Sequence, residues 1–316
     1  MGTYVVRAIL GAALVTVPIA AGAQEARFRT AVDLIHVGVT VLDENGHLIT
    51  NLNRDDFELY EEGRRQQVAF FAAGLPSARQ MHLGLLFDTS GSMTDDIKLA
   101  RSAAVRFLNT FPKAQDITLV DFDTEVRVAR YSQTDFPRLV ERIRSRKPDG
   151  WTALYDALGT YLDGAFEQNG RKILVLYSDG GDTRSAVTFS EALEMLRTSD
   201  VTVYAVGFLE HQPASVRSVQ RMRLMQLADV TGGRAFFPSS SRMLQDIFDR
   251  IAAEIRSEYS LGFTSTNLER DGRWRRLEVR LSGPRTKELK LRARAGYFAP
   301  LDMDAVPSAY RDTPTR

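Results

Sequence analysis

The sequence contains no cysteine, and this absence excludes several kinds of chemistry. Without cysteine there is no disulfide framework, no thiolate zinc site, no thiol nucleophile and no thiol-linked lipid anchor. Histidine is also scarce. The four histidines show no i, i+4 pairing and no H-E-x-x-H motif, so we do not expect a zinc hydrolase. They are His36, His47, His82 and His211.

The chain also lacks an excess of charge of either sign. Its 316 residues include 41 Lys and Arg and 40 Asp and Glu. No strong overall field therefore steers the protein to an anionic polymer or membrane, and we expect no nucleic-acid partner. Apolar residues (44%) and charged residues (26%) occur at values typical of a globular protein. The length allows one large or two modest domains with a sizeable core.

Motifs for nucleotide binding and for nucleophilic catalysis are missing as well. There is no G-x-x-x-x-G-K-[ST] loop, and Gly180-Gly181 lacks the spacing of a G-x-G-x-x-G motif. Neither Ser90 nor Ser92 lies in a G-x-S-x-G elbow. We therefore expect that the protein is not an enzyme, and an enzyme of a class without such motifs is the alternative.

The one long apolar run lies at the N-terminus. Arg7 precedes the run Ala8–Ala20, and Ala21-Gly22-Ala23 then supplies the small-x-small pattern that signal peptidase requires. The 13 residues of this run would span about 20 Å as a helix, less than the ~30 Å of a bilayer core. We therefore expect residues 1–23 to be a cleaved signal peptide rather than an anchor. The expected mature protein has no transmembrane segment and is exported, to the periplasm or the cell exterior.

Two segments near the ends of the chain show the period-two alternation of β-strands. Apolar side chains occupy every second position of residues 35–41, 277–281 and 289–295, as expected for strands with one buried face. Two further strands are expected at residues 55–59 and 67–71. Both ends of the chain therefore carry short β segments.

Neither β segment has enough strands to bury both of its faces. We expect residues 24–78 and 258–300 to pair with each other into one small β-sandwich-like domain, in which Glu61-Glu62-Gly63 joins the strands at residues 55–59 and 67–71. Two unrelated β units are the alternative. Residues 301–316 contain proline and show no periodicity, so we expect a flexible tail.

The middle of the chain, residues 79–257, alternates apolar strands with amphipathic helices. The runs His82–Phe87, Lys172–Tyr177 and Val201–Val206 are typical of strands covered on both faces, and Leu244–Ile255 has the periodicity of a helix. This alternation predicts an α/β fold: a Rossmann-like, doubly wound, mainly parallel sheet inserted into or flanked by the β-sandwich-like domain. Such sheets place their sites at the carboxyl ends of the strands.

A candidate site follows the first of these strands. The strand runs directly into Asp88-Thr89-Ser90-Gly91-Ser92, where a carboxylate and two hydroxyls can converge on one point. Oxygen ligands of this kind suit Mg²⁺, Mn²⁺ or Ca²⁺ rather than zinc or copper. Serine and aspartate before a helix also form ordinary N-caps, which is the alternative for this loop taken alone.

Two further loops complete the pattern. Thr152 precedes a helix, and Asp179 follows the strand that ends at Tyr177. In order and spacing the three loops resemble the von Willebrand factor type A domain and its metal-ion-dependent adhesion site. This resemblance implies a metal site formed by Asp88, Ser90, Ser92, Thr152 and Asp179. It also implies that a carboxylate of a partner protein completes the coordination of the ion.

We expect the ion to be Mg²⁺, with Mn²⁺ or Ca²⁺ as alternatives. Three of the five ligands are neutral hydroxyls, and one or both of the two carboxylates are expected to act through water. Much of the ion's double charge then stays uncompensated, so an incoming Asp or Glu binds strongly. The expected function is an exported protein-binding or adhesion module that recognises an acidic residue of its partner. The alternative is a structural envelope scaffold in which the metal only stabilises loops. The oligomeric state is left open.

The flanking segments carry a narrower resemblance. Residues 57–63, with the sequence FELYEEG, and residues 294–298, with the sequence RAGYF, are similar to the flanks of an exported acidobacterial family that carries this domain. The function of that family is poorly defined, so this resemblance adds context and no mechanism.

Four other aspartates lie close to the candidate loops. We expect Asp182 to lie in a solvated turn and Asp156 on a helix face, and an influence on the ion from beyond its ligands is the alternative. We expect Asp121 and Asp123 to serve a turn at the end of a strand, and a role as metal ligands is the alternative.

Basic clusters occur at residues 142–147 and 273–276. We expect both to be solvated faces, and a patch that binds polyanions is the alternative.

Overall fold

The computed structural model describes residues 34–74, 81–94, 97–210, 212–283 and 288–301. The predicted signal peptide lies outside these residues, and so does the predicted tail apart from Leu301. None of the helices in the described ranges has the length and hydropathy needed to span a bilayer. The predicted domain limits stay a prediction.

A sheet of six strands forms the centre of the middle segment. In spatial order its strands are β10 (Arg234–Phe236), β9 (Val201–Gly207), β8 (Arg171–Ser178), β5 (Met81–Asp88), β6 (Asp116–Phe122) and β7 (Val126–Tyr131). The neighbours pair in parallel except β6 and β7, which pair antiparallel. All 8 residues of β5 are buried, as predicted for a strand covered on both faces.

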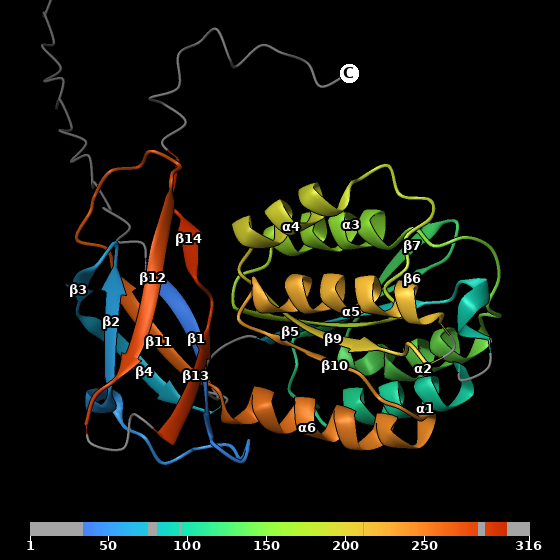
Figure 1. The fold of residues 1–316 in the computed structure, drawn as a ribbon, viewed down its shortest axis with the longest axis horizontal. Coiled ribbons are helices and arrows are strands. Elements are labelled where there is room, and N and C mark those ends of the chain that lie inside the picture. The colour runs from blue at the N-terminus through green and yellow to red at the C-terminus, as the bar shows by residue number, and fades with distance from the viewer. Residues whose placement is uncertain (1–33, 75–80, 95–96, 211, 284–287, 302–316) are drawn as a thin grey trace, which may run out of the picture. The chain divides into compact units, whose positions relative to one another are not determined.

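Helices cover both faces of this sheet (Figure 1). One face carries α1 (Ile97–Asn109), α2 (Phe136–Ser145) and α6 (Leu244–Ser257), and the other carries α3 (Leu154–Phe166), α4 (Phe189–Thr198) and α5 (Ala214–Asp229). Each set of helices shares a separate apolar core with its face of the sheet. The predicted doubly wound, mainly parallel α/β fold is therefore confirmed.

Strands from the two flanking segments pair with each other. The first sheet contains, in spatial order, β13 (Leu289–Ala293), β1 (Leu34–Asp43), β11 (Tyr259–Thr264) and β4 (Val68–Ala73). The second contains β14 (Gly296–Phe298), β12 (Trp274–Leu281), β2 (Phe57–Glu61) and β3 (Arg64–Gln66). All these pairs are antiparallel, and side chains such as Val37 and Leu59 from the two sheets share one apolar core. The arrangement is a small β-sandwich.

The prediction for the first β segment was wrong in one connection. Glu62 and Gly63 adopt positive φ angles of 48° and 76°, which makes a two-residue hairpin of the type I′ kind. This turn joins β2 to β3, whereas the strand predicted at residues 67–71 is β4 and lies in the other sheet. The strand predicted at residues 55–59 also begins later, because a 3-10 helix at Arg54–Asp56 precedes it.

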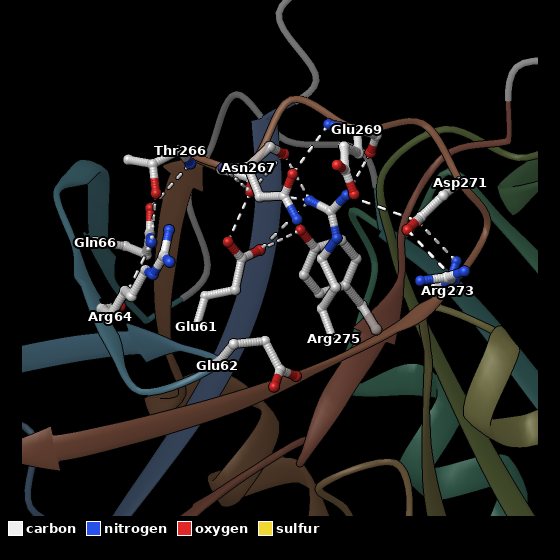
Figure 2. A network of polar contacts seen from close by, with 12 residues as sticks. Glu61, Glu62, Arg64, Gln66, Thr266, Asn267, Glu269, Asp271, Arg273 and Arg275 are labelled. Carbon is white, nitrogen blue, oxygen red and sulfur yellow. Dashed lines mark hydrogen bonds and ion pairs between the residues drawn. The ribbon is translucent and has the colours of Figure 1, made fainter.

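The prediction that residues 273–276 form a solvated face was wrong for Arg275. Its side chain is 5% exposed and lies within a polar network inside the β-sandwich (Figure 2). The guanidinium donates to the Ser265 hydroxyl at 3.0 Å and to the Asn267 carbonyl oxygen at 2.7 Å, and it lies 3.9 Å from the Glu61 carboxylate. Glu61 in turn accepts hydrogen bonds from Ser265 and from the Tyr297 hydroxyl. The buried charges are therefore paired and hydrogen-bonded.

Candidate metal site

The predicted site lies at the carboxyl end of β5, where the order of strands in the sheet reverses direction. β5 has β8 on one side and β6 on the other, so the loops that follow these strands diverge and leave a crevice. Asp88 is the last residue of β5 and lies opposite Phe122 of β6. Ser178 ends β8 on the other side. The sheet therefore places polar groups from neighbouring strands at one edge.

Both carboxylate oxygens of Asp88 accept hydrogen bonds. The Ser90 amide donates to Oδ1 at 2.9 Å, and the Ser178 hydroxyl donates to Oδ2 at 2.6 Å. Asp88 is fully buried, and this burial, together with the charge of Asp179, raises the pKa of Asp88 to about 7. Two carboxylates that repel each other in a buried place are stabilised by a nearby cation.

The serine loop turns both hydroxyls the same way. Ser90 Oγ and Ser92 Oγ lie 3.2 Å apart, and a short 3-10 helix occupies Gly91–Met93. The Ser90 side chain makes no capping hydrogen bond to this helix, so capping does not explain its position there. Ser90 is buried and Ser92 is exposed, so the pair of hydroxyls is open to solvent on one side.

Thr152 lies between the serine loop and the loop that follows β8. Its carbonyl oxygen accepts from the amide of Thr183 at 2.9 Å, and its own amide donates to the Thr183 hydroxyl at 3.0 Å. On the other side, the Gly91 amide donates to the carbonyl oxygen of Gly150 at 3.2 Å. Thr152 is 7% exposed. Backbone hydrogen bonds therefore hold all three predicted loops at one edge of the sheet.

Asp179 is fixed by its own loop and by a distant glutamine. Its Oδ1 accepts from the Gly181 amide and its Oδ2 from the Gln212 side chain, each at 2.8 Å. The turn requires a positive φ of 78° at Gly180, where a side chain would also meet Leu224 at 2.9 Å. Each carboxylate oxygen has a further lone pair and can still accept a water or a cation.

The donor set fits a hard cation. Hydrogen bonds join Asp88, Ser90 and Ser92 directly, and the charge of Asp179 acts on Asp88. The loop that contains Thr152 is tied to both neighbouring loops, through Thr152 itself on one side and through Gly150 on the other. Among the described residues no group of three or more His, Cys, Asp or Glu could hold a metal. A cation at this edge would therefore depend on hydroxyl oxygens as well as carboxylates, and the metal itself stays a prediction.

Sequence reasoning missed three side chains that shape this edge. Ser178 and Gln212 bind the two predicted carboxylates, and Thr183 binds the backbone of Thr152. For Ser178 a signal existed, because a serine that ends an apolar strand beside Asp179 falls at the same edge of the sheet. For Gln212 the sequence contains no such signal.

Two nearby aspartates stabilise loops. Asp182 was predicted to lie in a solvated turn, and this is wrong: its carboxylate accepts from the Tyr155 amide at 3.0 Å and from the Ser185 hydroxyl at 2.6 Å. It thereby satisfies a free N–H in the first turn of α3. Asp156 lies on α3, as predicted, and its two oxygens accept from the amides of Ala186 and Val187.

The turn predicted for Asp121 and Asp123 is confirmed for Asp123 alone. Asp123 follows β6 and accepts from the amide of Glu125 at 2.9 Å. Asp121 lies within β6, is buried, and pairs with Arg142 at 2.8 Å and Arg146 at 3.2 Å. These two arginines belong to the cluster at residues 142–147, which is therefore not a wholly solvated face.

The family of the chain follows from its sequence and agrees with this fold. The sequence profile of the von Willebrand factor type A domain matches residues 82–250, more than half of the chain. The chain belongs to this family. A comparison with curated proteins found no match. The narrower resemblance to exported acidobacterial proteins stays a prediction.

Several solved structures match this chain at low sequence identity. The PilB minor pilin from Streptococcus sanguinis is 16% identical with a TM-score of 0.47; the match covers 58% of this chain and 63% of that chain, less than two thirds of its length. The vWF domain of the type V pili tip protein Mfa5 from Porphyromonas gingivalis is 14% identical with a TM-score of 0.49, covering 57% of this chain and 96% of that chain. The von Willebrand factor type A structure from Catenulispora acidiphila is 15% identical with a TM-score of 0.49, and the match covers 81% of this chain and 76% of that chain. Similarities of this degree carry no conclusion about function.

Proposed function

We propose that the protein is an exported protein-binding module that recognises an Asp or Glu of a partner through a divalent cation. The cation, Mg²⁺ before Mn²⁺ or Ca²⁺, would be held by Asp88, Ser90, Ser92, Thr152 and Asp179. The observation that carries this proposal is the contact of the Asp88 carboxylate with the serine loop, beside the charge of Asp179. The removal of residues 1–23 on export belongs to the same proposal.

The chemistry of the donors supports recognition of a carboxylate. All five residues offer oxygen, which suits hard cations, and three of the five are neutral hydroxyls. When bound, the cation would supply an open coordination position to an acidic side chain. Asp88, Ser90 and Asp179 are buried and hold the interior side of the site, while the exposed Ser92 leaves the outer side accessible.

Backbone hydrogen bonds join the loops directly, which favours partner recognition over the scaffold alternative. The Asp149 amide donates to the Thr89 carbonyl oxygen at 2.9 Å, and the Gly91 and Thr183 amides bind the loop that contains Thr152. We also propose that the protein is not an enzyme, since neither serine lies in a nucleophile motif. Residues 24–78 and 258–300 are proposed as one domain around the inserted residues 79–257.

The substitution Asp179→Asn tests this function, because it removes a charge while keeping the shape of the side chain. We expect the affinity for Mg²⁺, measured by calorimetric titration, to fall at least tenfold, as is typical when a metal site loses one of its carboxylates. Capture of a partner from an envelope extract should require Mg²⁺, fail in EDTA and fail with the variant. The exposed Asp163 on α3 provides the control Asp163→Asn, which should keep both properties.

Partner capture that survives both EDTA and Asp179→Asn would refute recognition through a cation. The scaffold alternative predicts a different result. There, chelation lowers the melting temperature strongly and no partner depends on the metal.

A further inference from the structure

A groove lies directly beside the candidate metal site. It has a volume of about 440 Å³ and runs between residues 181–183 and helix α5. The groove begins at the proposed ligands, because the Gly181 amide donates to Asp179 Oδ1 at 2.8 Å and the Thr183 hydroxyl accepts from the Thr152 amide at 3.0 Å. A segment bound at the site therefore lies next to this groove.

One wall of the groove is apolar and exposed. Val216 and Val219 of α5 line it and are 40% and 45% exposed. When a partner covers exposed apolar side chains, the complex is stabilised in proportion to the apolar area removed from water. The groove therefore suits an aliphatic side chain.

The other lining groups are polar and include one arginine and one aspartate. The carboxylate of the aspartate, Asp182, already accepts from the Tyr155 amide and the Ser185 hydroxyl, so the argument for an acidic segment depends on Arg223. The Arg223 guanidinium lies 3.4 Å from the Tyr155 hydroxyl, and within the described ranges no carboxylate forms an ion pair with it. The side chain of Gln220 is 92% buried, since the residue is 8% exposed, and its carbonyl oxygen accepts no hydrogen bond from any described residue. This oxygen is buried beneath the groove, whereas a negative group on a chain that lies in the groove complements Arg223.

A second exposed apolar side chain belongs to the residue that precedes Thr152 in the sequence. Trp151 is 64% exposed, and its amide is fixed by the Thr124 hydroxyl at 2.9 Å. Exposed tryptophans that are held by their backbone are common anchors of protein interfaces. Trp151 is therefore a second exposed apolar residue in the loop that contains Thr152.

We propose that the partner segment is an acidic peptide stretch in which an aliphatic residue neighbours the metal-binding carboxylate. The aliphatic side chain occupies the groove against Val216 and Val219, and a second negative group faces Arg223. This inference rests on the proposed function and adds the chemical class of the sequence that is recognised.

Synthetic peptides with one central Glu test this inference. Leu or Ser occupies each flanking position in turn, and binding is measured in Mg²⁺ and in EDTA by tryptophan fluorescence and by NMR titration. At one position or more we expect Leu to bind about tenfold more tightly than Ser, the ratio that a buried aliphatic side chain supplies. Val219→Ser should remove this gain. Met222→Ser is the matched control, since Met222 lies on the same helix, is 51% exposed and does not line the groove.

The outcomes separate this inference from the proposed function. Binding that requires Mg²⁺ but shows no difference between Leu and Ser, or a Leu gain that persists in Val219→Ser, overturns the inference alone. If Leu peptides bind more tightly than Ser peptides even in EDTA, and Val219→Ser removes this difference, the role of the cation is overturned while the inference about the groove holds. Absence of binding by every peptide overturns the inference, while the Mg²⁺ titration of the Asp179→Asn variant decides the proposed function independently.

Discussion

The hydroxyl of Ser178 orients the carboxylate of Asp88. It donates at 2.6 Å to the oxygen that the serine loop leaves free, so both oxygens of this buried group have a fixed direction. A ligand that is oriented by its neighbours binds a metal more tightly than one that must be ordered on binding. Ser178 is therefore a positioning residue for the proposed site.

The substitution Ser178→Ala removes this hydrogen bond. We expect the Mg²⁺ affinity to fall by about 10- to 100-fold, and the free energy of unfolding to fall by about 1–3 kcal/mol, because a buried acceptor loses its partner. Calorimetric titration and urea denaturation measure the two effects. Ser102→Ala on α1 removes an exposed hydroxyl that binds the Lys98 carbonyl oxygen, and it should change neither. An unaltered Mg²⁺ affinity in Ser178→Ala would rule out the positioning role.

At the scale of residues, contacts within one short loop can be predicted from sequence, whereas contacts between distant segments cannot. Asp88, Ser90 and Ser92 lie within one short loop, so their convergence follows from a strand end and a turn. Gln212 reaches Asp179 across 33 positions of sequence, and such a contact depends on how α5 and its preceding loop pack. No local pattern encodes that packing.

Strand β5 and helix α3 approach each other closely at Gly84. A Cβ on Gly84 would lie 2.3–2.6 Å from ring atoms of Tyr161, which is itself 2% exposed. The absence of a side chain on the central strand thus allows the tyrosine to pack flat on the sheet. This contact fixes the helix that begins two residues after Thr152.

The pair Gly84→Ala and Gly159→Ala tests this contact. Gly84→Ala should lower the free energy of unfolding by about 1–3 kcal/mol, because the ring of Tyr161 must move. At Gly159 on α3 a Cβ would meet Met195 at 3.4 Å, an ordinary contact, and alanine is favoured over glycine within a helix by up to about 1 kcal/mol. That variant should be as stable as the wild type or more so. Equal urea midpoints for the two variants would show that the contact does not constrain the packing.

At the scale of elements, the buried strands and α6 were predictable because their apolar patterns are long. β3 has 3 residues, of which two are arginines, and gives no alternation to detect. Helix α5 exposes Val216 and Met222 and buries Leu224. Because its apolar residues lie on both the exposed and the buried side, the sequence shows no clear 3.6-residue apolar periodicity. The exposed valines that obscure this period are the same residues that line the proposed groove.

The β-sandwich receives its inserted segment between two paired strands. β4 and β11 are antiparallel neighbours, with Ala73 opposite Tyr259, and the Gly74 amide donates to the Glu258 carbonyl oxygen at 3.0 Å. The two ends of the inserted segment therefore leave the sandwich side by side, at the spacing of a hairpin.

Replacing residues 75–257 by a short Asn-Gly turn tests this arrangement. We expect the shortened chain to fold as a β-sandwich that unfolds cooperatively, because a tight turn can close two antiparallel strands and the sandwich has its own apolar core. Circular dichroism on heating and the dispersion of amide NMR signals measure the result. A chain that aggregates or melts without cooperativity would mean that the sandwich depends on the inserted domain.

The pairing of β1 also constrains the order in which the strands of a newly synthesised chain can fold. Its partners β11 and β13 both come from the far end of the sequence. At about 5–20 residues per second of synthesis, roughly 10–40 s pass between the ribosome's release of β1 and of β11. Until β11 and β13 are available, β1 lacks both of its strand neighbours. The first sheet of the sandwich therefore cannot be completed before the far end of the chain is available, and such long-range pairing slows folding.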